Sequence, residues 1–91
     1  MFSAGIREGG MDQLARTPKQ VGAAIRRRRR RVGLTQKRLG EQTRLRQATI
    51  SALENGERGT QLRTLLDVVT ALGLEIVIRE RSTGRNIEDI F

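Results

Sequence analysis

The sequence predicts a small all-α domain of four to five helices that is followed by one β-strand. Between residues 17 and 73, apolar residues recur at intervals of three and four, in stretches bounded by capping residues or glycines. After Gly73 the pattern changes to alternation. The 91 residues suffice for one modest core. We therefore expect a flexible segment 1–16, a helical domain 17–73, a strand 74–80 and a flexible tail 81–91.

Composition excludes several classes of function. The net charge of +8 favours a polyanionic partner, most simply a nucleic acid. The chain has no cysteine and no histidine, and its few carboxylates are scattered, so we expect no enzymatic activity, no cofactor and no metal site. No apolar run approaches the roughly 18 residues of a membrane span, and the N-terminus lacks a secretory signal. We expect a cytoplasmic protein.

The first predicted helix begins with strong start signals. Thr17 can cap it, Pro18 occupies the first helical position, and Gln20 completes a capping box. Gly33 is a typical left-handed terminator. The inward face of this helix carries four apolar residues at helical spacing: Val21, Ala24, Ile25 and Val32.

This helix contains the run of six arginines from Arg26 to Arg31. Six consecutive residues point all around a helix, so the arginines cannot share one role. Arg28 and Arg29 lie nearest the apolar face, and the other four point toward solvent or a partner. An arginine on the inner face needs an acidic partner, because an unpaired buried charge costs several kcal/mol.

Three further helices are predicted. The second runs from its N-cap Thr35 to about Thr43 and has little apolar content besides Leu39. The third runs from about Gln47 to Asn55, with Ile50 and Leu53 inward, and Asn55-Gly56 ends it. The fourth runs from Leu62 to Leu72 before Gly73, and its apolar stripe consists of Leu62, Leu65, Leu66, Val69 and Leu72.

The segment 74–80 alternates in the manner of a strand, with Leu74, Ile76 and Ile78 on one side. A lone strand has two unpaired edges and is unstable by itself. An antiparallel partner from a second copy of the chain, across a two-fold axis, is the simplest solution. We therefore predict a homodimer that forms through this strand.

The second and third helices have the spacing of a helix-turn-helix motif. They are separated by three residues, with Arg44 at the turn, and Gly40 is small enough to let the third helix approach closely. Four apolar residues at the remaining key positions would bury two crossed helices against each other: Leu39, Leu45, Ile50 and Leu53. The alternative is a helical hairpin without a ligand.

The segment GLTQKRLGEQTRLRQATISALENG at 33–56 resembles the Xre/phage-repressor-type helix-turn-helix family, through LTQ, ATIS and LENG. The resemblance covers roughly residues 18–74 and implies a lambda-repressor-like fold. It is nearest to HipB-type antitoxins, which are dimers that bind operator DNA and a HipA-type serine/threonine kinase toxin. Two residues depart from the family: Arg44 replaces the usual turn glycine, and Arg28 replaces an apolar residue. A non-glycine residue in the left-handed region costs roughly 1 kcal/mol.

The third helix is the predicted recognition helix, whose N-terminal end faces base edges in the major groove. The candidate base contacts are Arg46, Gln47, Ala48, Thr49, Ser51 and Ala52. Glutamine can bind adenine bidentately, arginine can bind guanine, and alanine fits a thymine methyl group. Thr49 has the alternative roles of helix cap or phosphate ligand.

Other residues are candidates for phosphate contacts, which position a protein on DNA. Thr35 and Gln36 open a helix whose N-terminal amides attract anions, and with Asn55 they resemble the family's clamp on either side of the groove. Lys37, Arg26 and Arg30 would add charge neutralisation. For the two arginines, a solvated helix face is the alternative.

The family resemblance also implies two further roles. Arg29 is expected to pair with Glu54 and so to hold the first helix on the recognition helix, a structural role. In the tail, Ile87, Ile90 and Phe91 are expected to engage the kinase, as a C-terminal hydrophobic residue does in HipB-like proteins. Frayed ends are the alternative for this tail.

The function predicted from these features is repression of the protein's own operon through a palindromic operator, together with neutralisation of a kinase toxin. One alternative is a solitary phage-like regulator without a toxin. Another is a basic module that binds RNA or membrane surfaces without sequence preference. The shortage of aromatic residues argues against sequence-specific binding to single-stranded RNA.

Overall fold

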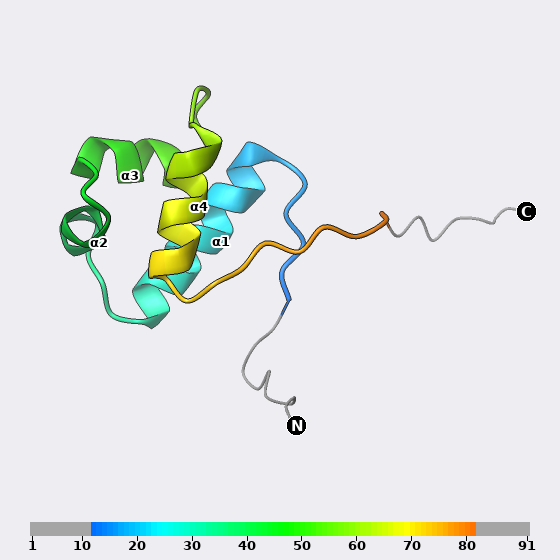
Figure 1. The fold of residues 1–91 in the computed structure, drawn as a ribbon, viewed down its shortest axis with the longest axis horizontal. Helices are drawn as coiled ribbons and strands as arrows, with labels where there is room; N and C mark the ends of the chain where they lie inside the picture. The colour runs from blue at the N-terminus through cyan, green and yellow to red at the C-terminus, as the bar shows by residue number, and fades with distance from the viewer. Residues whose placement is uncertain (1–11, 82–91) are drawn as a thin grey trace, which may run out of the picture.

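The computed structural model describes residues 12–81, which contain four helices around one core (Figure 1). The helices are α1 (Pro18–Arg31), α2 (Gln36–Thr43), α3 (Gln47–Glu54) and α4 (Leu62–Ala71). The predicted all-α domain is confirmed, with each helix close to its predicted bounds. Residues 1–11 and 82–91 lie outside the described part, and with them the tail residues Ile87, Ile90 and Phe91. Among the described residues, none of the helices is long and apolar enough to cross a membrane.

Helix α1 begins as its start signals predict. The Thr17 hydroxyl accepts a hydrogen bond from the Gln20 amide at 3.0 Å, and Pro18 is the first helical residue. In a capping box the Gln20 side chain would accept from the amide of the N-cap residue Thr17. Here it accepts instead from the amide of the preceding residue, Arg16, at 2.6 Å. The prediction for Val32 was wrong: it is exposed, because it is the C-cap and lies past the last helical turn.

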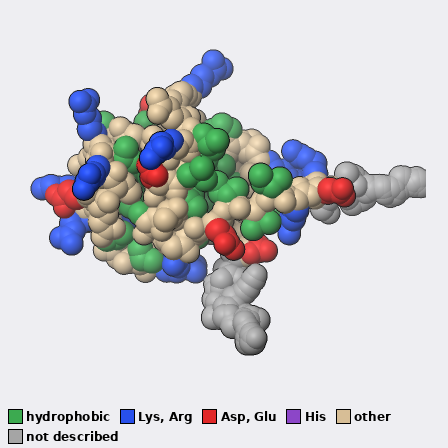
Figure 2. Space-filling model, viewed as in Figure 1, with side chains coloured by type: hydrophobic (Ala, Val, Ile, Leu, Met, Phe, Trp, Pro, Cys, Tyr) green, Lys and Arg blue, Asp and Glu red, His purple; other side chains and the backbone are tan. Residues whose placement is uncertain are grey.

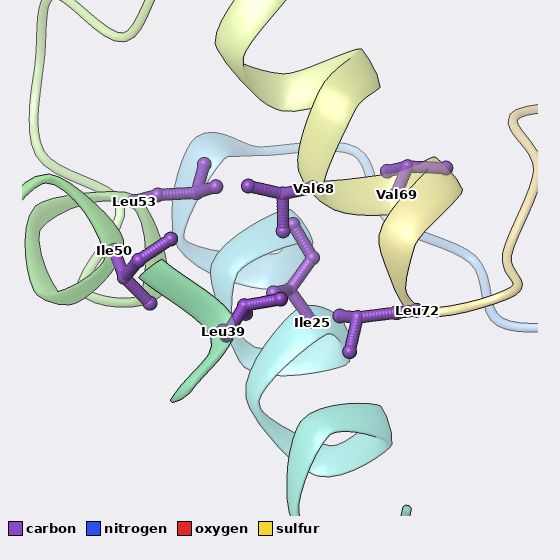
Figure 3. Close-up of a cluster of buried hydrophobic side chains, with 7 residues drawn as sticks. All are labelled: Ile25, Leu39, Ile50, Leu53, Val68, Val69 and Leu72. Atoms are coloured by element: carbon purple, nitrogen blue, oxygen red, sulfur yellow. The ribbon is translucent and has the colours of Figure 1, made fainter. Parts of the chain in front are cut away.

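The hydrophobic core lies between all four helices (Figure 3). Its seven buried residues are Ile25, Leu39, Ile50, Leu53, Val68, Val69 and Leu72. The prediction for α4 was partly wrong, because Leu62 and Leu66 are 68% and 44% exposed while Val68 is completely buried. The sequence of α4 carries two overlapping apolar stripes. Val68, Val69 and Leu72 face the core, whereas Leu62 and Leu66 face outward.

Two glycines allow helices to approach each other closely. A Cβ atom on Gly22 of α1 would lie 2.4 Å from the carbonyl oxygens of both Leu53 and Glu54 on α3. A Cβ atom on Gly40 would lie 2.7 Å from the Leu45 carbonyl oxygen. Main-chain atoms of α3 therefore contact α1 closely, and main-chain atoms of the turn before α3 contact α2 closely.

Residues 74–80 leave the helical core after Gly73 and are not assigned to a strand in the described chain (Figure 1). Leu74 packs against the edge of the core, but Ile76 is half-exposed and Ile78 is 94% exposed. A strand is defined by pairing with a neighbour, and residues 12–81 of a single chain offer none here. Pairing with a second copy therefore stays a prediction.

Candidate nucleic-acid interface

The turn between α2 and α3 determines how the two helices cross. Arg44 ends α2 in the left-handed conformation, with φ 60° and ψ 37°. The Leu45 amide donates to the Gly40 carbonyl at 2.8 Å, which satisfies one of the last carbonyls of α2. The arginine that replaces the usual glycine thus adopts the glycine-like conformation, and the turn keeps its geometry.

The N-terminal end of α3 presents most of the candidate base contacts at the surface. Arg46, Gln47 and Ala48 are exposed, whereas Thr49, Ser51 and Ala52 are half-buried. Arg46 is the N-cap residue, and no side chain caps α3. Thr49 therefore does not cap α3, which was one of the alternatives to a base contact. Three exposed side chains and the free amides of the first turn of α3 thus lie together.

The candidate phosphate contacts come from the start of α2, the far end of α3 and the surface of α1. Thr35 is the N-cap of α2, and its hydroxyl oxygen accepts from the Arg38 amide at 3.0 Å, which leaves its proton free to donate. Lys37, Asn55, Arg26 and Arg30 are exposed, and Gln36 is half-buried. Figure 2 shows Lys and Arg side chains projecting from the left end of the molecule, where α2 and α3 lie in Figure 1.

The arginine run divides between the interior and the surface, as predicted. Arg29 is buried, and Arg28 is half-buried with its Nε donating to the Leu72 carbonyl at the end of α4, at 2.9 Å. The stem of Arg28 therefore lies beside the core while its head satisfies a helix-terminal carbonyl. The remaining arginines of the run, Arg26, Arg27, Arg30 and Arg31, are exposed.

Arg29 and Glu54 form a bidentate ion pair between α1 and α3. Arg29 Nε lies 2.6 Å from Glu54 Oε2, and Nη2 lies 3.0 Å from Oε1. Both side chains are buried, and Arg29 Nη1 also donates to the Leu34 carbonyl at 2.9 Å. The hydrogen bond to Glu54 raises the pKa of Arg29. Burial opposes ionisation of Glu54, but the hydrogen bonds from Arg29 and Gln36 and the nearby charges outweigh it and lower the pKa of Glu54.

Sequence reasoning missed one connection, which runs from this ion pair to the surface. Gln36 Nε2 donates to Glu54 Oε1 at 3.1 Å, and Gln47 Nε2 donates to Gln36 Oε1 at 3.4 Å. Gln36 and Gln47 are the first residues of α2 and α3. The short turn between the helices brings these two helix starts together. In the sequence, only the small number of residues between the helices indicates this contact.

The comparisons with known proteins agree with this geometry. The helix-turn-helix family model matches residues 25–78, more than half of the chain. Among solved structures, a complex of a HipB variant with an O2 20mer has 29% sequence identity and a TM-score of 0.73, covering 79% of this chain and all of that one. The structure of a HipA-HipB-O2-O3 complex has 30% identity and a TM-score of 0.72, covering 78% of this chain and all of that one.

A third structure, described as MDT protein, has the same identity, TM-score and coverage as the HipA-HipB complex. No curated protein matches this chain. The matched family model includes the whole of the α2–α3 pair. This chain belongs to the Xre-type helix-turn-helix family, and within it to the HipB-like proteins.

Proposed function

We propose that this protein is a sequence-specific DNA-binding repressor that acts as a homodimer on a palindromic operator in its own promoter. One observation carries the proposal: the exposed start of α3 lies beside the start of α2, where Gln47 donates to Gln36, and the neighbouring Lys37 of α2 is exposed. An α-helix fits the major groove with its N-terminal residues toward the bases, while helix N-termini and cations bind the phosphates on either side. HipB neighbours in complex with operator oligomers support this proposal.

In this proposal the base contacts come from Arg46, Gln47 and Ala48, with Thr49, Ser51 and Ala52 one turn deeper. The phosphate contacts come from Thr35, Gln36, Lys37, Asn55, Arg26 and Arg30. The dimer forms through residues 74–80, whose apolar side chains are largely exposed in the single chain. Half-sites would lie about one helical turn, or a multiple of ~10 bp, apart.

The experiment is a gel-shift titration with DNA from upstream of the gene and a scrambled duplex of the same composition. We expect Arg46→Ala and Gln47→Ala, with unchanged circular dichroism, to lose most of the preference for the native duplex. Arg58→Ala, an exposed residue in the loop before α4, is the control and should keep it. Equal binding of both duplexes by the parent protein would instead support a non-specific basic module.

We also propose that the protein is the antitoxin of a HipA/HipB-type module and binds a serine/threonine kinase toxin. The HipA-HipB complex among the structural neighbours supports this role. In this chain, the tail residues Ile87, Ile90 and Phe91 lie outside the described structure. Their assignment as the kinase contact comes from the family resemblance alone. Deletion of residues 87–91 should weaken binding to a kinase encoded beside the gene and leave DNA binding intact. The absence of a kinase gene there would favour a solitary regulator.

A further inference from the structure

Residues 72–74 connect the helical domain to the segment that is proposed to pair in the dimer. Leu72 is buried at the end of α4, and Leu74 is half-buried against the core. Every residue from 75 to 81 is exposed. The direction in which the segment 75–81 leaves the domain is therefore set at residues 72–74, which we call the exit joint.

Main-chain hydrogen bonds hold the amide groups of the exit joint. The Gly73 amide donates to the Thr70 carbonyl at 3.0 Å, and the Leu74 amide donates to the Val69 carbonyl at 2.9 Å. Gly73 has a φ of 70°. This is the Schellman arrangement that commonly ends a helix at a glycine. These two bonds do not involve the carbonyl group of Leu72, which lies in the same peptide unit as the Gly73 amide.

The carbonyl group of Leu72 is held by a different helix. Arg28 of α1 donates from Nε to this oxygen at 2.9 Å. A Cβ atom on Gly73 would lie 3.4 Å from Arg28 Nη2, so the guanidinium group lies against the exit joint itself. The peptide unit between Leu72 and Gly73 is thus bound at its N–H by α4 and at its C=O by α1. Because a peptide unit is planar, the two bonds together fix its orientation.

Loss of the Arg28 bond would free one end of this peptide unit. Leu72 is only 3% exposed, and a buried carbonyl without a hydrogen-bond partner is unfavourable, which favours its rotation toward water. Gly73 permits such a rotation because it lacks a Cβ atom. A rotation at the exit joint changes the direction of the whole segment 75–81. The Arg28 bond therefore restricts this segment to one direction.

We propose that Arg28 is a positioning residue that restricts the dimer to one spacing of half-sites. In the proposed dimer, the direction at each exit joint sets the distance and rotation between the two copies of α3. One added base pair moves a half-site by about 3.4 Å and rotates it by about 34°. The inference rests on the proposed dimer and its operator, and adds to them what determines the spacing. The apolar residue that is usual at this position in the family could not donate this bond.

Two substitutions of Arg28 separate the hydrogen bond from the charge. Arg28→Met keeps most of the length of the side chain but removes the donor. Arg28→Gln places its Nε2 donor the same number of bonds from Cα as the Nε of arginine. Both variants remove the positive charge, so a difference between them reports the hydrogen bond. We expect Arg28→Met to fold, because an apolar residue is usual at this position in the family, and circular dichroism checks this.

The first measurement examines the dimer without DNA. The chain has no cysteine, so Arg38→Cys, at an exposed site of α2, provides a single attachment point for a spin label in each copy. Double electron–electron resonance then gives the distribution of distances between the two labels. We expect one narrow distribution for Arg38→Cys alone and for its combination with Arg28→Gln. The combination with Arg28→Met should give a clearly broader one.

The second measurement is selection by the full-length protein from a library of random duplexes, followed by sequencing of the bound DNA. The parent and Arg28→Gln should enrich one spacing of the half-sites about ten-fold or more over spacings that differ by one base pair, because other spacings require distortion of the DNA. For Arg28→Met we expect a ratio below about three-fold, since the dimer itself then adapts. The half-site sequence should be the same for all three proteins.

The outcomes separate this inference from the proposed function. A narrow distribution and one sharp spacing for Arg28→Met would overturn the inference and leave the proposed function intact. Equal broadening for both variants would also overturn it, because the charge rather than the bond would then matter. Loss of folding in Arg28→Met would count against it, since Arg28 would then be needed for the core.

The parent protein supplies the remaining tests. If it enriches a half-site without a fixed spacing, or gives no distance between the labels, the inference fails although specific binding to one half-site stands. If it enriches no half-site, the proposed function fails with it. The distance distributions then still show whether the Arg28 bond fixes the exit joint.

Discussion

Glu54 shows at the scale of one residue how a charge can be held inside a small core. Its two oxygens accept three hydrogen bonds, two from Arg29 and one from Gln36. Removal of one member of a buried ion pair typically costs about 3 kcal/mol or more, because the other charge is left without a partner. We expect Glu54→Gln to lose about this much free energy of unfolding at neutral pH, measured by urea denaturation.

The pKa of Glu54 adds a pH dependence to this expectation. Because that pKa is lower in the folded chain than its ordinary value of 4.5, ionisation of Glu54 stabilises the fold. This stabilisation is fully present above pH 4.5 and is lost as the pH falls through the lower, folded-state pKa. The stability difference between the parent and Glu54→Gln should therefore shrink in acid, in denaturation curves recorded at a series of pH values. A constant difference would contradict the ion pair as its source.

Arg44 stores backbone strain in the helix-turn-helix turn. Its φ of 60° lies in the left-handed region, which costs a residue with a side chain roughly 1 kcal/mol or more. We expect Arg44→Gly to stabilise the fold by about 0.5 kcal/mol, since the greater entropy of glycine in the unfolded chain offsets part of the relief. Thermal unfolding would measure this. Arg44→Ala, which keeps a Cβ atom, is the control and should give no such gain.

At the scale of elements, the contact of α1 with α3 depends on Gly22. Alanine favours a helix over glycine by up to about 1 kcal/mol, but a Cβ atom here would meet two main-chain oxygens at 2.4 Å. Overpacking of this kind typically costs about 1–3 kcal/mol. We expect Gly22→Ala to destabilise the protein by about 2 kcal/mol in urea denaturation. Arg30→Ala, at an exposed site of the same helix, should change stability by less than about 0.5 kcal/mol.

The four helices could be predicted from the sequence because apolar residues recur at helical spacing and some helix ends carry local signals, such as Thr17-Pro18 and Gly33. The buried face of α4 could not be predicted fully. Leu65, Val69 and Leu72 belong to both of its overlapping apolar stripes, and only the positions of α1 and α2 decide that Val68 is buried rather than Leu66. The contact of Gln36 with Gln47 was missed for the same reason, because periodicity within a helix carries no information on how two helices cross.

At the scale of the whole molecule, the exposed Ile78 allows the proposed dimer to be tested without disturbing the fold. Because Ile78 is 94% exposed in the single chain, Ile78→Glu should leave the helices intact. In the proposed strand pair it places two like charges near the two-fold axis, so we expect monomers by light scattering at concentrations where the parent is dimeric. Val77→Glu, on the opposite side of the strand, should stay dimeric. The reverse result would show that the strand has the other face inward.

The charge distribution predicts a steep dependence of DNA affinity on salt. If Lys37, Arg26 and Arg30 of both chains each contact a phosphate, the slope of log affinity against log salt concentration should be about −5. Lys37→Ala should make this slope shallower by about two for the dimer, one for each chain. Binding titrations at several salt concentrations would test both values. A slope that does not respond to Lys37→Ala would remove this residue from the interface.

The backbone contact of Gly22 with the end of α3 has a consequence for how such proteins diverge. Because main-chain atoms of α3 contact α1 closely, the position of α3 on the domain does not depend on the side chains of its outer face. Those side chains can be exchanged during evolution without re-docking the helix. Duplicated copies of the gene could therefore acquire new target sites through surface substitutions alone, at little expense to folding.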